Sequence, residues 1–124
     1  MPRARRPSPP ATIRARVWVE RGGVVALTDA GADLLEQIQA TGSLSEAARA
    51  LRFSYRRAWM LLDAMNSRWD GPLVTTRVGG QRGGGARLTE LGGRILRSFR
   101  DLQIHVEAAV DQQAKGFRRA ARLS

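Results

Sequence analysis

Residues 41–59 read TGSLSEAARALRFSYRRAW, and this stretch predicts two short helices joined by a tight turn. Ser43 or Ser45 starts the first helix and Ser54 caps the second, because a serine hydroxyl accepts hydrogen bonds from the free N–H groups at a helix start. Such helix starts also suit phosphate oxygens, so the three serines are candidate contacts to a DNA backbone. The order of short helix, turn and longer helix is typical of a helix-turn-helix motif, which places its second helix in a DNA groove.

The second helix of this motif has two distinct faces. Its inward residues recur at helical spacing and predict a buried face: Ala58, Leu61, Leu62 and Met65. The outward face carries Tyr55, Arg56 and Trp59, with Arg57 near the border. An arginine forks onto O6 and N7 of guanine, and an aromatic ring meets a thymine methyl group, so we expect this face to contact DNA bases. The alternative is a solvated basic face whose aromatic side chains pack on a neighbouring element.

A glycine-rich basic segment follows the motif. Residues 75–87 read TTRVGGQRGGGAR and lie between a predicted strand at 73–78 and a returning strand at 86–88. Glycine allows a backbone to approach a phosphodiester closely, and arginines add positive charge. The segment does not match a nucleotide-binding loop, because no Lys-Ser/Thr follows it and it leads into a strand. Its candidate DNA contacts are Arg77, Gln81, Arg82 and Arg87.

Two further elements are expected before the motif. Residues 13–19 alternate between apolar and other side chains, which predicts a strand, and Gly22 and Gly23 turn the chain into a second strand at 24–27. Thr28 then caps a helix that ends near residues 41–42. The expected buried stripe of this helix is Leu34, Leu35 and Ile38.

The last helix is long and carries a regular apolar seam. Thr89 caps it, and its pattern extends to about Lys115. The seam steps by four and three residues, close to a heptad, through Ile95, Phe99, Leu102, Val106 and Ala109. A small domain needs only the first turns of such a helix, so we expect the seam to form a homodimer interface. The alternative is a helix that lies back across its own domain.

The charge of the chain is concentrated where the motif lies. The net charge of +10, from 21 basic and 11 acidic residues, favours a polyanion such as nucleic acid or an anionic membrane surface. Residues 43–88 hold eight arginines against three acidic residues, a local charge of +5. The terminal stretches 1–12 and 115–124 carry seven basic residues and no acidic one. We expect the first to be a disordered arm and residues 116–124 to be a basic tail.

Several classes of protein are not expected. The chain has no cysteine, which excludes disulfides, thiolate nucleophiles and zinc–cysteine sites. Residues 1–12 lack the apolar core of a signal peptide, and no apolar run approaches the roughly 18 residues of a membrane span. His105 is the only histidine and lacks a carboxylate cluster, and no nucleophile, base and orienting group can be assembled. We therefore expect a cytoplasmic, nucleoid-associated protein that is no enzyme, binds no cofactor or metal, and contacts no membrane.

Four stretches of the sequence resemble the N-terminal domain of the molybdate-responsive regulator (ModE) family: residues 42–48, 54–59, 63–66 and 79–89. The Ser-Tyr-basic-x-Ala-Trp string and the Gly-Gly-x-basic-Gly-Gly-Gly run carry the resemblance, which covers about residues 13–113. More loosely, the segment is similar to the LysR-type winged helix-turn-helix. The resemblance implies a recognition helix containing Ser54, Tyr55, Arg56, Arg57 and Trp59, with Gln81 and Arg82 at the tip of a wing.

The resemblance also implies an operator-binding dimer formed by the first and last helices, which brings Leu34 and Ile38 into the interface. It does not extend to the oxyanion-binding C-terminal domains of the full regulator. We therefore expect that a small-molecule effector such as a molybdate-type oxyanion does not bind this chain.

Together these patterns predict a mainly helical (α+β) winged helix-turn-helix domain at 13–115, with an N-terminal β-hairpin and a dimerisation helix at about 89–115. The predicted function is sequence-specific binding of double-stranded DNA by a homodimeric transcription regulator. One alternative is nonspecific nucleic-acid binding, architectural or to RNA, driven by the basic tails. Another is a DNA-binding subunit that needs a separate sensor partner.

Overall fold

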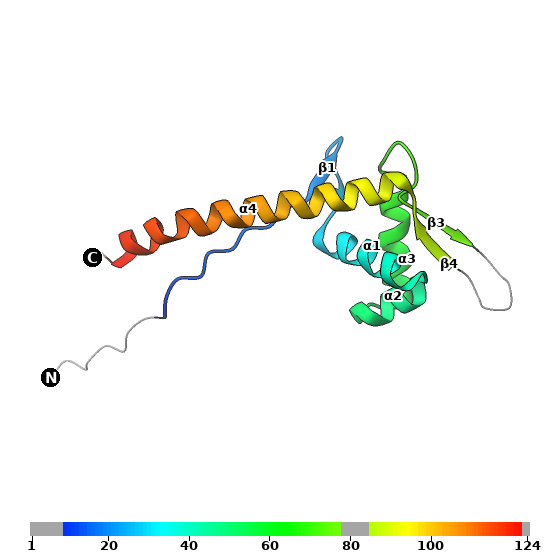
Figure 1. Ribbon diagram of the computed structural model, residues 1–124, viewed down its shortest axis with the longest axis horizontal. Coiled ribbons are helices and arrows are strands. Elements are labelled where there is room, and N and C mark those ends of the chain that lie inside the picture. Colours follow the sequence, from blue (N-terminus) through cyan, green and yellow to red (C-terminus); the bar gives the residue numbers. More distant parts are fainter. Residues whose placement is uncertain (1–8, 78–84, 123–124) are drawn as a thin grey trace.

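A computed structural model of the chain describes residues 9–77 and 85–122. The described elements are β1 (Val19–Arg21), β2 (Val24–Leu27), α1 (Asp29–Thr41), α2 (Leu44–Leu51), α3 (Tyr55–Ser67), β3 (Val74–Arg77), β4 (Gly85–Leu88) and α4 (Glu90–Arg122). Figure 1 shows α1, α2, α3 and both hairpins gathered around the N-terminal part of α4, whose C-terminal part extends away from them. This mainly helical α+β arrangement is consistent with the predicted winged helix.

Helix α1 lies in the centre of the hydrophobic core. Its predicted stripe of Leu34, Leu35 and Ile38 is at most 1% exposed, which confirms that this face is buried. The stripe belongs to one cluster with Leu62 of α3 and Leu73, the residue before β3. Burying an aliphatic side chain of this size contributes about 2 kcal/mol. One core therefore holds the helix-turn-helix and the second hairpin together.

Local capping sets the boundaries of the helix-turn-helix. Ser43 and Ser54 each accept a hydrogen bond from the backbone N–H three residues later, at 3.2 and 3.0 Å. Ser54 is thus the cap that was predicted, and of the two candidates for the first helix the cap is Ser43. Between α2 and α3, Arg52 adopts a left-handed conformation with φ of 58°. A left-handed conformation costs a residue other than glycine about 1–2 kcal/mol. The turn is closed by a hydrogen bond from the N–H of Phe53 to the carbonyl of Ala48 at 2.9 Å.

The same threonine cap starts α1 and α4. Thr28 Oγ1 accepts from the N–H of Gly31 at 3.2 Å, and Thr89 Oγ1 accepts from the N–H of Gly92 at 2.9 Å. Both threonines were predicted to be caps, and both predictions are confirmed. The N–H of Thr89 also donates to the carbonyl of Leu73 at 2.9 Å. This last bond ties the start of α4 to the start of the second hairpin.

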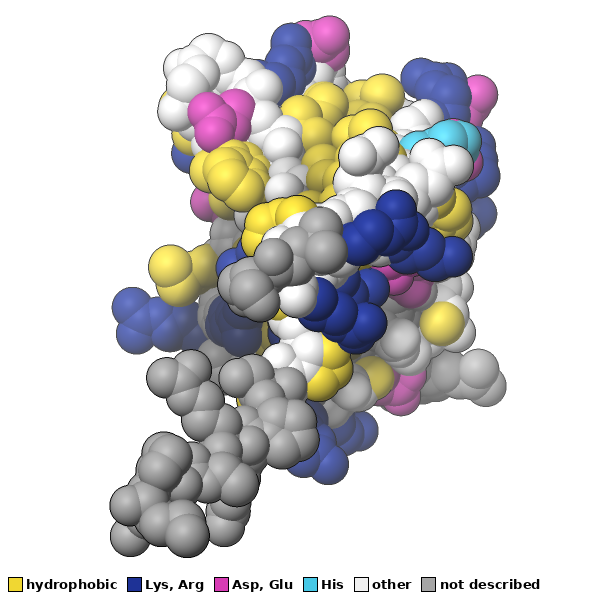
Figure 2. Space-filling view, turned by 90° about the vertical axis from the view of Figure 1, so that its left-hand side faces the viewer, with side chains coloured by type: hydrophobic (Ala, Val, Ile, Leu, Met, Phe, Trp, Pro, Cys, Tyr) yellow, Lys and Arg dark blue, Asp and Glu magenta, His cyan; other side chains and the backbone are white. Residues whose placement is uncertain are grey.

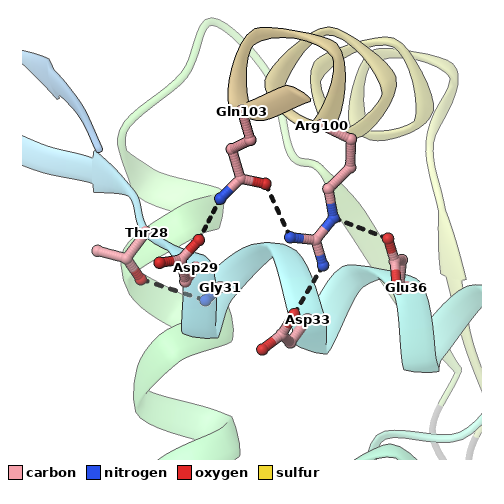
Figure 3. A network of polar contacts seen from close by, with 7 residues as sticks. All are labelled: Thr28, Asp29, Gly31, Asp33, Glu36, Arg100 and Gln103. Carbon is pink, nitrogen blue, oxygen red and sulfur yellow. Dashed lines mark hydrogen bonds and ion pairs between the residues drawn. The ribbon is translucent and has the colours of Figure 1, made fainter. Parts of the chain in front are cut away.

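A polar network joins α1 to α4 outside the core. Figure 3 shows Arg100 of α4 between two carboxylates of α1, with Nη2 2.6 Å from Asp33 and Nε 2.7 Å from Glu36. Gln103 accepts from Arg100 at 2.9 Å and donates to Asp29. Partial burial opposes the charged form of Arg100, but its hydrogen bonds and the two negative charges outweigh burial and raise the pKa of the guanidinium. Arg100 therefore stays charged and holds α4 in a defined position on α1.

The N-terminal part of the chain differs from the prediction. Residues 13–18 form no strand, and Val19 alone of the predicted strand at 13–19 pairs with β2; strand β1 continues beyond the prediction to Arg21. The predicted turn is confirmed, because Gly22 and Gly23 have φ of 58° and 79°, as a two-residue hairpin turn requires. Upstream of it, residues 9–18 run beside α4 (Figure 1), and the carbonyl of Ala11 accepts from Arg118 at 3.0 Å. Residues 13–17 line a hollow beside α4, and Val17 packs against the hydrophobic core, where a sheet was expected.

Helix α4 is longer than its apolar pattern suggested. It continues beyond Lys115 to Arg122, so most of the predicted basic tail at 116–124 is helical. Ala114 is only 3% exposed in this distal part, where residues 9–18 lie beside the helix. The start of the predicted arm at 1–12 and the last two residues of the tail lie outside the described residues.

The predicted dimer seam is divided between the core and the surface. Leu34, Ile38 and Phe99 are at most 3% exposed, so they serve the core of this chain and leave almost no surface for a partner. Ile95 packs against the same core, since the first turns of α4 cross α1. Three residues of the predicted seam keep surface that a partner could contact: Leu102 and Ala109 are exposed, and Val106 is half-buried.

Candidate nucleic-acid interface

The outward face of α3 carries large side chains in solvent. Tyr55, Trp59 and Met60 are 54%, 41% and 64% exposed. The rings of Tyr55 and Trp59 meet edge to face, with centroids 6.2 Å apart. Each ring therefore orders the other, while both keep an exposed surface that a nucleic acid can contact.

The two arginines of this face have different surroundings. The guanidinium of Arg57 lies over the ring of Phe53, 4.0 Å from its centroid, in a cation–π contact. Arg56 is exposed and takes part in none of the ion pairs among the described residues. Arg56 is thus the freer of the two to fork onto a base, and Arg57 is held against the turn of the motif.

A groove separates α2 from the β3–β4 hairpin. Its walls include Ser43, Ser45 and Arg49 on one side and Arg77 and Arg87 on the other. The hydroxyls of Ser43 and Ser45 are 3.0 Å apart at its edge. Four of these five residues were predicted from the sequence as DNA contacts. Arg49 was not, although its spacing of four residues from Ser45 places both on one face of a helix.

Asn66 connects α3 to the hairpin, and the sequence reasoning did not identify it. It lies in the last turn of α3, which continues to Ser67. Its Oδ1 accepts from the N–H groups of Leu73 and Val74 at 2.9 and 3.1 Å, and its Nδ2 donates to the carbonyl of Val74 at 3.0 Å. One amide thereby sets the position of β3 relative to α3.

The hairpin and the N-terminal end of α3 extend away from α4 in Figure 1. The N–H of Ala86 in β4 donates to the carbonyl of Gly42 at 2.9 Å, which attaches the hairpin to the turn between α1 and α2. Of the predicted contacts in the hairpin, Arg77 and Arg87 are exposed on its strands. Gln81 and Arg82 lie outside the described residues.

The described residues also bear on metal binding, on membrane-spanning helices and on the single histidine. Within residues 9–77 and 85–122, no group of three metal-binding side chains comes together, and no helix is long and apolar enough to cross a membrane. His105 is exposed, with Nδ1 2.8 Å from the carbonyl of Asp101 on its own helix.

Comparison with known proteins identifies relatives over most of the described domain. No family model matches the chain. It is 39% identical over 98 residues to the molybdenum transport protein ModE of Azotobacter vinelandii, covering 79% of this chain and 36% of that protein. It is 38% identical over 108 residues to the molybdenum-pterin-binding protein MopB of Rhodobacter capsulatus, covering 83% of this chain and 38% of that protein.

A third relative is named for its function in transcription. The DNA-binding transcriptional dual regulator ModE of Escherichia coli K12 is 38% identical over 66 residues, which are 53% of this chain and 25% of that protein. The chain thus spans between a quarter and two fifths of the length of these relatives. The helix-turn-helix, the basic hairpin and these identities agree, and the chain is homologous to the N-terminal region of ModE regulators.

Proposed function

We propose that the chain binds double-stranded DNA in a sequence-specific manner as a winged helix-turn-helix homodimer. Helix α3 enters the major groove, and the β3–β4 hairpin contacts the backbone beside it. The observation that supports this most directly is the exposed face of α3, where Tyr55, Arg56 and Trp59 project from a helix whose opposite face is buried. The homology to a DNA-binding regulator supports the same use of this surface.

Arg56→Ala tests the recognition helix. Selection of bound duplexes from random sequence first defines the preferred site of the parent protein. On that site we expect Arg56→Ala to lose about 1–3 kcal/mol of binding free energy and to relax preference at one base position. Arg119→Ala removes an exposed arginine from the distal part of α4 and serves as the matched control. If both variants bind like the parent at matched salt, α3 does not read the site.

Selection of bound duplexes from random sequence also distinguishes this proposal from nonspecific binding by the basic N- and C-terminal segments. A parent protein that enriches no sequence, and whose binding disappears when residues 1–12 and 116–124 are removed, acts through its tails. A parent that keeps its sequence preference after the same truncation acts through the helix-turn-helix.

The dimer is proposed from the exposed part of α4. Leu102 is 45% exposed and Phe117 is 59% exposed on a helix of 33 residues that extends beyond its own domain. Figure 2 looks at the C-terminal end of this helix and shows hydrophobic side chains gathered in the upper half of that face. Apolar surface of this kind is typical of a protein interface. A two-fold dimer would place two α3 helices in successive major grooves.

We expect Leu102→Asp to shift the monomer–dimer equilibrium strongly toward monomer, because a carboxylate replaces an apolar contact in the interface. A loss of at least 2 kcal/mol, or roughly 30-fold in the dimer dissociation constant, is expected. Analytical ultracentrifugation over a range of concentrations measures it. Ala108→Asp adds the same charge on another face of α4 and should leave the equilibrium unchanged. A parent protein that is monomeric at every concentration contradicts the dimer.

A further inference from the structure

We propose that the groove between α2 and the β3–β4 hairpin holds a phosphodiester of the bound DNA, and that Arg49 positions it. This inference rests on the proposed function and adds a residue and a subsite to it. Arg49 lies on the α2 wall of the groove, and Arg77 and Arg87 lie on the hairpin wall. The three arginine side chains together would form a binding site for one backbone phosphate, which we call the phosphate site.

The register of the hairpin places its two arginines on the same face. Arg77 pairs with Gly85, and Arg87 pairs with Thr75. Residues directly opposite in an antiparallel pair share a face, and residues two apart on a strand share it as well, so Thr75, Arg77 and Arg87 project to one side. The other side is turned to the core, because Val74 and Ala86 are at most 2% exposed. The arginine-bearing side is therefore the outer one, which α2 borders.

The two walls of the groove are connected by backbone. The hydrogen bond from the N–H of Ala86 to the carbonyl of Gly42, at 2.9 Å, ends one residue before Ser43, which caps α2. The groove is thus bounded by a strand and a helix that are bonded to each other at its base. A site held in this way needs little ordering of the backbone when an anion enters.

The arginines of the groove form no ion pair with a carboxylate among the described residues. Arg49, Arg77 and Arg87 take part in no ion pair there, whereas Arg100 contacts two carboxylates and Arg21 contacts Asp70. The only acidic residue in the groove lining is Glu46. Guanidinium groups bind phosphate through paired N–H donors, and a bound anion also relieves their mutual repulsion. An anion with several oxygens fits this donor set.

The phosphate of a DNA strand is favoured as that anion because the groove borders the helix-turn-helix itself. Ser43 accepts from the N–H of Glu46, and one hydroxyl proton joins Ser43 to Ser45 at 3.0 Å, so the other hydroxyl proton of this pair can be directed to another acceptor. Contacts of this kind fix the register of a protein on the duplex and carry no sequence information. Arg49 is accordingly a positioning residue, and it should affect all sequences alike.

The first arm of the test is the salt dependence of binding. On the duplex selected by the parent, Arg49→Ala should bind roughly fivefold to tenfold more weakly, with the slope of log affinity against log salt lower by about one unit. The base preference should be that of the parent. Arg49→Lys keeps the charge and should restore the slope, and Arg119→Ala should match the parent in both quantities. Thermal melting of each variant confirms that it is folded, since both arginines are exposed.

The second arm locates the phosphate. Single neutral methylphosphonate linkages are placed in turn along each strand of the selected duplex. At one position per half-site, the neutral linkage should weaken the parent but not Arg49→Ala, because the missing charge and the missing guanidinium belong to one contact. If every linkage weakens DNA binding by the parent and by Arg49→Ala equally, and the salt slopes of the two proteins agree, the proposed phosphate site is wrong. The proposed function is not affected by that result. A parent that binds no duplex overturns both proposals.

Discussion

Gly92→Ala is expected to destabilise the protein strongly, because the added methyl group would clash with backbone at the start of α4. A Cβ atom at this position would lie 2.1 Å from the carbonyl oxygen of Leu73 and 2.9 Å from its carbonyl carbon. Both are backbone atoms, and the same carbonyl accepts the N–H of Thr89 at 2.9 Å, so it cannot move away without loss of that bond. We expect a loss of about 3 kcal/mol in the free energy of unfolding, measured by urea denaturation.

Gly116→Ala is the control for this prediction. Gly116 lies in the same helix, and nothing is within 4 Å of a Cβ atom built on it. Alanine there should stabilise the helix by up to about 1 kcal/mol, because glycine is the poorer helix former. The two substitutions therefore have opposite expected signs. Equal midpoints for Gly92→Ala and the parent would show that the start of α4 is not packed on Leu73 in this way.

Asn66→Ala is expected to separate the second hairpin from α3. The substitution leaves three backbone groups of Leu73 and Val74 without their partner, in residues that are at most 2% exposed. Since an unsatisfied buried polar group costs about 1–3 kcal/mol and relaxation recovers part of it, we expect a loss of about 3 kcal/mol in total. Amide hydrogen exchange at Leu73 and Val74 should become faster than in the parent relative to exchange in α1.

Two other substitutions serve as comparisons for the stability loss expected of Asn66→Ala. Asn66→Asp keeps an acceptor for the two N–H groups but directs a carboxylate at the carbonyl of Val74, so its stability should lie between alanine and the parent. Ser67→Ala removes an exposed hydrogen bond to the carbonyl of Ala64 and should change stability by less than about 0.5 kcal/mol. If Asn66→Ala is as stable as Ser67→Ala, the amide does not hold the hairpin.

Features that depend on neighbours within a few residues were predictable. Thr28, Ser54 and Thr89 each accept an N–H three residues later, so the sequence alone located three helix starts. It narrowed the start of α2 to Ser43 or Ser45, and the structure selects Ser43. The periodicity of α3 correctly divided Ala58, Leu62 and Met65 from the exposed face. Local bonding and helical spacing thus determined the helix-turn-helix and the side of α3 on which a DNA interface can lie.

Features that depend on distant contacts were decided by the tertiary structure. Residues 13–18 alternate like a strand but run beside α4, because an extended segment can bury its apolar side chains on a helix as well as in a sheet. Leu34 and Ile38 are apolar whether they face a partner or their own core, and packing assigned them to the core. The roles of Asn66 and Gly92 arise from strands and helices that come together only after folding, so spacing along the chain does not predict them. Spacing places Arg49 on the same face of α2 as Ser45, but only the folded structure places that face beside the β3–β4 hairpin.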